Sequence, residues 1–369
     1  MLQVLLFTFL VTVFFILIII EYAKNLELID VPNQRSSHTM PKPRGAGIAM
    51  FLSFFFTFVL FDYDFFIKNC TFFLSVFIVF SAGLLDDVKD VPPKLKFLFI
   101  IAAVILLFFT TDIKIGSLGV WFGEDLVIPA VFSLFFTIFA VAGYTNALNL
   151  IDGLDGLAGG ISLIIFLAFL YLGIVYQDIF VVNISIIMSV AIFAFLLFNW
   201  YPAKVFMGDS GSLVLGFTIS VVAIKLIQHI NTVPILFLAA LPILDTIMVM
   251  VRRMQRHMSP FKADKSHIHH KVLKWKTKVD YSVMLLLLIQ VSFSLLGILI
   301  STHSNFLNLL IYLIVLKIFF YVFDDRKVPR KEILLSTHLK ITNFLEKLKY
   351  KYILLGSFIV GLVFYKVLL

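Results

Sequence analysis

The stretch SAGLLDDVKDVPPKLKF, residues 81–97, marks the edge of a membrane in this sequence. It joins two apolar runs and places three carboxylates between them, Asp86, Asp87 and Asp90. One charged side chain at the centre of a transmembrane helix costs about 2.5–3.5 kcal/mol on insertion scales, so three together are tolerated only at a helix end. The Pro-Pro pair that follows would end the helix. The stretch is therefore predicted to be a loop between two membrane-spanning helices.

The same alternation continues along the chain, of which 61% is hydrophobic and only 14% charged, which excludes a soluble domain. Runs long enough to cross about 30 Å of hydrocarbon as helices start near Val4, Gly45, Thr71, Phe97, Val127, Leu157, Ile179, Gly211, Thr232, Tyr281 and Phe306. We therefore predict an all-α polytopic membrane protein with about eleven transmembrane helices. A last apolar run, 352–369, is either a twelfth span or a helix at the interface.

The distribution of Lys and Arg predicts the orientation. If the chain crosses at every run, most basic residues fall in one set of loops, 21–44, 86–96, 146–157, 199–210, 252–280 and 324–352. The opposite loops hold only Lys68 and Lys114. By the positive-inside rule the first set is cytoplasmic. This asymmetry also explains the net charge of +8, so we expect no nucleic-acid partner.

Two further features limit the classes of protein to which this chain could belong. Met1–Gln3 contain no basic residue, so the first span is predicted to be an anchor and not a cleaved signal peptide. The single cysteine, Cys70, excludes an internal disulfide framework and a cysteine metal cluster.

The acidic stretch 86–96 has two interpretations. The three Asp side chains could simply be solvated charges at a helix end. They could instead form a magnesium or general-base site, because hard divalent cations bind carboxylate oxygens and usually keep phosphate oxygens as further ligands. Lys94 and Lys96 would then help to hold an anionic substrate.

The segment NALNLIDGLDGLAGG, residues 146–160, is more specific. Asn149 with Asp152, and Asp152 with Asp155, are spaced so that each pair can share one side of a helix. The whole run cannot share one face at about 3.6 residues per turn. Its glycines fit a break where backbone approaches a ligand. A glycine-rich helix-packing patch would explain the glycines but not the acids and amides at a membrane boundary.

In FNWYPAKVFMGDSGSLVLGF, residues 198–217, Asp209 lies between Gly208 and Gly211. It directly precedes a predicted helix, whose N-terminus would present free N–H groups to phosphate. Alternatively, Asp209 or Ser210 is the N-cap, which would not exclude metal binding. Phe206 is either ordinary core or a surface on which a nucleobase stacks.

The basic segment SPFKADKSHIHHKVLKWKTK, residues 259–278, carries His267, His269 and His270. This spacing does not turn all three toward one point of a helix, so it is weak support for a zinc site. Hydrogen-bond donors and cations for a diphosphate are the better interpretation. A basic anchor on an anionic leaflet is the alternative.

These motifs together, GLLDDVKDVPPKLK, NALNLIDGLDGLAGG, NWYPAKVFMGDSGS and PFKADKSHIHH, resemble those of the polyprenyl-phosphate N-acetylhexosamine-1-phosphate transferases. That superfamily includes the bacterial undecaprenyl-phosphate GlcNAc-1-phosphate transferases of teichoic acid, O-antigen and enterobacterial common antigen synthesis, and the translocase that makes lipid I. The resemblance covers residues 1–325, the predicted transferase domain, and the SHIHH form favours the GlcNAc branch. It does not cover the basic segment and apolar helix predicted for residues 326–369.

The resemblance implies an enzyme of the inner (plasma) membrane with its site in a cleft on the cytoplasmic face. It would transfer a HexNAc-1-phosphate from a UDP-HexNAc to undecaprenyl (polyprenyl) phosphate, release UMP and require Mg²⁺, with Mn²⁺ as a possible substitute. The reaction would start a cell-envelope polysaccharide, and a homodimer is possible.

The resemblance also implies roles for individual residues. Asp209 and Asp87 would bind the metal, with Asp86 and Asp87 as the acidic pair and Lys96 beside them. Substrate contacts would come from Asn146, Asn149, Asp152, Asp155, Asn199, Phe206 and Gly208. His267, His269 and His270 would contact the diphosphate.

Some features depart from the pattern or leave alternatives. The RGAG at 44–47 replaces the usual RGGG of relatives, a change expected to affect only packing.

DDVKD also matches the DDxxD signature of a prenyltransferase, which would need a second such motif. An ion-coupled transporter would explain intramembrane acids and broken helices, but the acids lie at one face and no repeated half is found. Asp245 could line the floor of the site or pair with a lysine.

Overall fold

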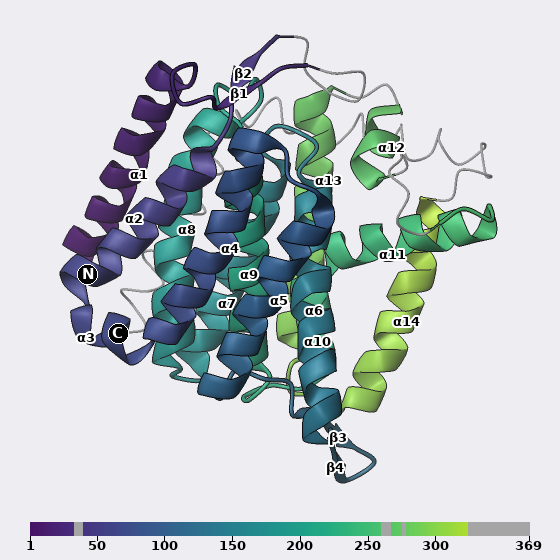
Figure 1. Cartoon of the computed structure of the whole chain (residues 1–369). Helices are drawn as coiled ribbons and strands as arrows, with labels where there is room; N and C mark the ends of the chain where they lie inside the picture. The colour runs from purple at the N-terminus through teal and green to yellow at the C-terminus, as the bar shows by residue number, and fades with distance from the viewer. Residues whose placement is uncertain (33–39, 260–266, 275–277, 324–369) are drawn as a thin grey trace.

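The computed structural model describes residues 1–32, 40–259, 267–274 and 278–323. Its helices are α1 (Leu2–Tyr22), α2 (Ala46–Phe61), α3 (Tyr63–Lys68), α4 (Cys70–Lys89), α5 (Pro93–Thr110), α6 (Ala130–Ile151), α7 (Leu157–Val175), α8 (Ile179–Asn199), α9 (Asp209–Leu226), α10 (Thr232–Leu238), α11 (Ala240–Gln255), α12 (Ile268–Lys274), α13 (Val279–Leu299) and α14 (Asn305–Val322). Two antiparallel hairpins, β1 (Ile29–Asp30) with β2 (Lys42–Pro43) and β3 (Ser117–Trp121) with β4 (Glu124–Val127), lie at opposite ends of the helical bundle (Figure 1).

The helices confirm an all-α polytopic membrane protein. Nine helices of the described residues, α1, α4–α9, α13 and α14, are long and apolar enough to cross a membrane. A tenth span is present only if α10 and α11, which meet at 87°, are one broken span. The run predicted from Gly45 is α2, an apolar helix of only 16 residues. The count of eleven therefore stays a prediction, and both the apolar run 352–369 and the segment 326–369 lie outside the described residues.

The break between α10 and α11 is stabilised by a neighbouring helix. Gln290 of α13 is fully buried there. Its side chain accepts a hydrogen bond from Leu241 N at 3.1 Å and donates one to Leu238 O at 2.8 Å. Backbone groups freed inside a membrane protein must find such partners, because lipid offers none. Figure 1 shows the result, α11 lying across the direction of the long helices.

Helix α9 is the most enclosed of the spans, and α2 and α4 approach its first turn very closely. A Cβ atom added at Gly83 of α4 would lie 2.5 Å from Asp209 O, and one added at Gly47 of α2 would clash with the backbone of Gly211. Only glycine allows backbones to approach this closely in helix packing. The start of α9 is therefore held at a fixed distance from the ends of two other helices.

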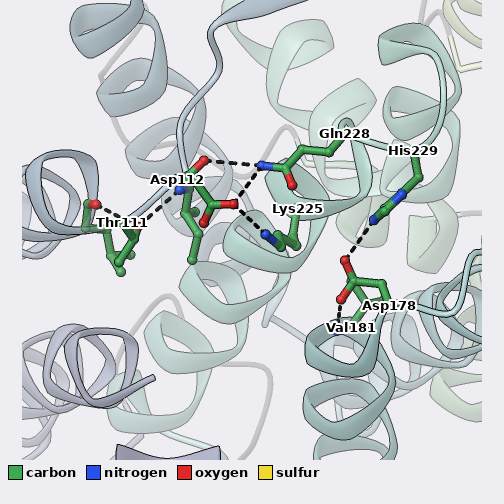
Figure 2. A network of polar contacts seen from close by, with 9 residues as sticks. Thr111, Asp112, Asp178, Val181, Lys225, Gln228 and His229 are labelled. Atoms are coloured by element: carbon green, nitrogen blue, oxygen red, sulfur yellow. Dashed lines mark hydrogen bonds and ion pairs between the residues drawn. The ribbon is translucent and has the colours of Figure 1, made fainter. Parts of the chain in front are cut away.

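Polar contacts also fix the opposite end of α9 (Figure 2). Lys225 Nζ lies 2.7 Å from Asp112 Oδ2, and His229 Nε2 lies 2.8 Å from Asp178 Oδ2. The hydrogen bond from Lys225 keeps the pKa of Asp112 below its usual value. Asp178 also accepts a hydrogen bond from Val181 N and so caps the start of α8. The end of α9 is thus tied to the loop after α5, and the turn that follows α9 is tied to the start of α8.

Candidate active site

Five predicted site residues form one polar network at the first turn of α9: Asp86, Asp87, Lys96, Asn149 and Asp209. They come from the end of α4, the start of α5, the end of α6 and the start of α9, which are far apart in the sequence. Figure 1 shows these helices side by side in the bundle. The structure thus brings the first three sequence motifs together.

Lys96 is the cation at the centre of this network. Its Nζ atom lies 2.7 Å from Asp209 Oδ2 and 3.1 Å from Asp86 Oδ2. Asn149 Nδ2 donates to the other oxygen of Asp209 at 3.0 Å and to Ser212 Oγ at 2.9 Å. The side chains of Asp86, Lys96 and Asp209 are 16%, 20% and 22% exposed, so an anionic substrate can reach them.

Asp87 has a different position, because its carboxylate caps α9 from another helix. Its two oxygens accept hydrogen bonds from Asp209 N at 2.8 Å and Ser210 N at 3.0 Å. A Cβ atom at Gly208 would lie 2.6 Å from both oxygens, so glycine is required at this position, where φ is 76°. Asp87 is 2% exposed. Its predicted role as a metal ligand stays a prediction.

This cap corrects two sequence-based interpretations. The first N–H groups of α9 are not free for phosphate, because Asp87 accepts from two of them and Gly208 O accepts from Gly211 N and Ser212 N. Neither Asp209 nor Ser210 caps the helix by its own side chain. Asp90, the third acid of the stretch, is exposed at the end of α4.

The loop after α6 carries Asp152 and Asp155. Asp152 is half-buried, and burial together with the charges of Asp209, Asp155 and Asp87 raises its pKa to about 7. Asp155 Oδ2 accepts a hydrogen bond from Ala203 N at 2.8 Å. The loop therefore places one largely desolvated carboxyl group, Asp152, next to one that is held by a backbone N–H, Asp155.

Two further predicted substrate contacts, Asn199 and Asn146, lie in the same region, and their contact with substrate stays a prediction. Asn199 accepts from Gly156 N and donates to Val205 O, both at 2.9 Å, and is 5% exposed. It therefore braces the two loops that carry the site. Asn146 is half-buried on α6, one turn before Asn149.

Phe206 lies beside the strand that precedes α2. Lys42 Nζ is 5.1 Å from the centroid of the Phe206 ring and 3.7 Å from Asp155 Oδ2. Phe206 N donates to Pro43 O, and Phe206 O accepts from Ala46 N. Ala46, the departure in RGAG, is fully buried in this contact, and an effect on packing alone stays a prediction. Lys42 was missed in the sequence, where PKPRGAG gave only a general basic signal.

Asp245 of α11 holds His267 and the start of α12. His267 Nδ1 lies 2.8 Å from Asp245 Oδ2, and Ile268 N donates to Asp245 Oδ1 at 2.7 Å. Asp245 is 1% exposed. Among the described residues the Asp245 carboxylate pairs with a histidine, and no lysine of this part of the chain is its partner.

The three histidines differ in their surroundings. The rings of His267 and His269 are 5.9 Å apart and nearly parallel, and those of His269 and His270 are 4.2 Å apart. His269 packs on Gly153 and is 2% exposed. Burial and the two neighbouring histidines lower the pKa of His269 well below its usual value, so it is neutral. Its Nδ1 has no hydrogen-bond partner among the described residues.

The described part of the chain contains no group of three or more His, Cys, Asp or Glu that could hold a metal by itself. This leaves room for magnesium, which is usually held by one or two carboxylates together with substrate phosphates and water.

Comparison with known proteins assigns the family. The model of glycosyl transferase family 4 matches residues 69–227. The undecaprenyl-phosphate alpha-N-acetylglucosaminyl 1-phosphate transferase of Escherichia coli K12 is 30% identical over 327 residues, which cover 85% of this chain and 88% of that protein. A probable undecaprenyl-phosphate N-acetylglucosaminyl 1-phosphate transferase of Bacillus subtilis 168 is 29% identical over 316 residues, 84% and 88% of the two chains. Because the identity extends over most of both chains, this protein belongs to glycosyl transferase family 4, the polyprenyl-phosphate N-acetylhexosamine-1-phosphate transferases.

Proposed function

We propose that the protein transfers N-acetylglucosamine-1-phosphate from UDP-N-acetylglucosamine to undecaprenyl phosphate, releasing UMP. Membership of the family supports the reaction class, and the names of the relatives support the sugar and the lipid. The observation that carries the site is Lys96 held between Asp86 and Asp209 at the start of α9. The prenyltransferase alternative loses support, because Asp86 and Asp87 have different partners and Asp90 is exposed.

In this reaction an oxygen of the lipid phosphate attacks the β-phosphorus of the UDP-sugar. The bond between the β-phosphorus and the bridging oxygen breaks, and UMP leaves with the electron pair. Both reactants are anions, so catalysis depends mainly on alignment and on neutralisation of charge. Lys96 supplies a cation that is already fixed, and its ammonium can donate to a phosphate oxygen while it remains near Asp86.

Magnesium fits this site as a cofactor bound partly by substrate. Asp209 and Asp86 present partly exposed carboxylate oxygens, the hard ligands that magnesium prefers. We assign Asp209 as the main protein ligand and Asp87 as the residue that fixes the helix carrying it. When bound, magnesium would neutralise charge on the diphosphate.

The remaining motifs would position the donor. Phe206 offers an aromatic surface for uracil, although Lys42 lies over the ring, so the base must use the other face or displace this lysine. His267, His269 and His270 would face the diphosphate. The distribution of Lys and Arg supports a site at the cytoplasmic face. UDP-sugars would be dissolved on that side, and the lipid phosphate would lie at headgroup level. The product would start a cell-envelope polysaccharide.

The test uses purified protein in detergent with undecaprenyl phosphate, magnesium and a panel of UDP-sugars, and follows UMP release with and without EDTA. We expect release that requires both lipid and magnesium and is fastest with UDP-N-acetylglucosamine. Asp209→Asn is the matched inactive control, because the start of α9 stays capped through the backbone N–H of this residue. Fastest release from another UDP-sugar would refute the sugar assignment, and undiminished release in EDTA would refute the magnesium requirement.

A further inference from the structure

We propose that Asp245 is a positioning residue for this transfer, because it fixes the proton of His267 on Nδ1 and aligns the histidine segment with the loop that follows α6. The proposal rests on the function proposed above. Asp245 itself does not contact the reacting groups; it acts through His267.

The geometry uses both oxygens of the Asp245 carboxylate. Oδ2 lies 2.8 Å from His267 Nδ1, and Oδ1 accepts from Ile268 N, the first residue of α12, at 2.7 Å. An ionised carboxylate only accepts hydrogen bonds, so the nitrogen that faces it must carry the proton. The Nδ1 of His267 is therefore protonated, and Nε2 is the nitrogen left for a second partner.

A simple capping role does not explain a carboxylate at this position. Asp245 is 1% exposed, and a buried charge costs several kcal/mol unless it is paired. A neutral side chain such as Asn would accept from Ile268 N at a lower desolvation cost. Among the described residues, the charged partner of this carboxylate is His267, and there the negative charge selects the tautomer.

The effect of Asp245 extends to the predicted donor site. The His267 ring lies nearly parallel to that of His269, 5.9 Å away, and His269 packs on Gly153 next to Asp152. The fixed α12 thus places a column of two imidazoles between α11 and the loop after α6. A displaced His267 would shift His269 on Gly153, where a Cβ atom would already clash with its ring.

The experiment compares Asp245→Asn, Asp245→Ala, His267→Ala and the double variant Asp245→Asn with His267→Ala. Asn still accepts from Ile268 N, but its amide N–H₂ faces His267 and forces the proton onto Nε2. We expect Asp245→Asn to melt near the wild type and to lose about 10- to 100-fold in kcat/KM, as when carboxylates that orient metal-bound histidines are removed. The loss should match that of His267→Ala, and the double variant should be no worse. Asp245→Ala should also melt at a lower temperature.

Wild-type kcat/KM in Asp245→Asn would overturn the proposal and leave Asp245 as a helix cap alone. Additive losses in the double variant would also overturn it, because Asp245 would then act independently of His267. A second measurement does not depend on turnover, so it separates these results from failure of the proposed function. It records the ¹⁵N chemical shifts of protein labelled at histidine, and the signals of His267 are identified by their absence in His267→Ala. Protonated Nδ1 in the wild type and protonated Nε2 in Asp245→Asn are expected, and the same tautomer in both would refute the inference.

Discussion

Replacing Asp87 by Asn should destabilise the protein even when magnesium is absent. The carboxylate accepts from Asp209 N and Ser210 N, and both bonds are charge-assisted. Hydrogen bonds to charged groups contribute about 1.5–3 kcal/mol each, and a neutral one about 1 kcal/mol. Asn keeps one neutral bond and turns its amide N–H₂ toward the other backbone N–H. It also loses the attraction between a carboxylate and a helix N-terminus, about 0.3–1 kcal/mol.

Relief from burying a charge offsets part of this loss, because Asp87 is 2% exposed. The free energy of unfolding should therefore fall by about 2–3 kcal/mol, because one charge-assisted hydrogen bond is lost and the other is weakened. The expected cost requires only that the carboxylate holds the first turn of α9.

The assay is thermal unfolding in detergent with EDTA, at one scan rate because unfolding is expected to be irreversible. Asp86→Asn is the matched control: it removes a carboxylate from the adjacent position, which is partly exposed and pairs with Lys96. We expect a clearly lower midpoint for Asp87→Asn and a smaller change for Asp86→Asn. Equal midpoints for Asp87→Asn and wild type in EDTA, with a difference only in magnesium, would refute the capping role and favour Asp87 as a metal ligand.

Three further outcomes follow from the contacts. Gly153→Ala should reduce kcat/KM strongly with little loss of membrane insertion, because the added methyl group displaces His269; unchanged UMP release would contradict this packing. Burial raises the pKa of Asp152 to about 7 in the folded protein, whereas its value in the unfolded chain is about 4. Between these pH values the folded state binds more protons than the unfolded state, so the stability of the wild type should fall as pH rises from about 4 to 7. Melting midpoints of Asp152→Asn in EDTA should lack this fall, and parallel pH curves would disprove the shift. Lys225→Met removes the ion pair with the largely exposed Asp112 at the far end of α9 and should cost at most about 1 kcal/mol, with kcat unchanged in the UMP assay.

Much of the architecture could be predicted because long apolar runs leave helix as the available structure in a membrane. The bend within the run from Thr232 could not, because it depends on Gln290, a partner about fifty residues later whose side chain happens to reach the freed backbone. The meeting of the first three motifs at α9 could be expected, because all three were predicted to lie on the same side of the membrane.

The partners of each carboxylate could not be predicted from the sequence. Asp86 and Asp87 are adjacent and chemically identical, yet one pairs with Lys96 and the other caps α9, because their side chains leave α4 in different directions. The same limit applies to Asp245, since nothing in PILDTIM indicates a histidine partner. A residue type gives the chemistry that is available, whereas the packing of distant helices decides which groups it meets.

Transfer of label from UDP-N-acetylglucosamine carrying ³²P in its β-phosphate tests the central claim most directly. After incubation with the protein, magnesium and undecaprenyl phosphate, the label should move to the lipid together with the sugar, and the UMP released should be unlabelled. Label that stays in the nucleotide while sugar reaches the lipid would mean transfer of the sugar alone and would contradict phosphosugar transfer.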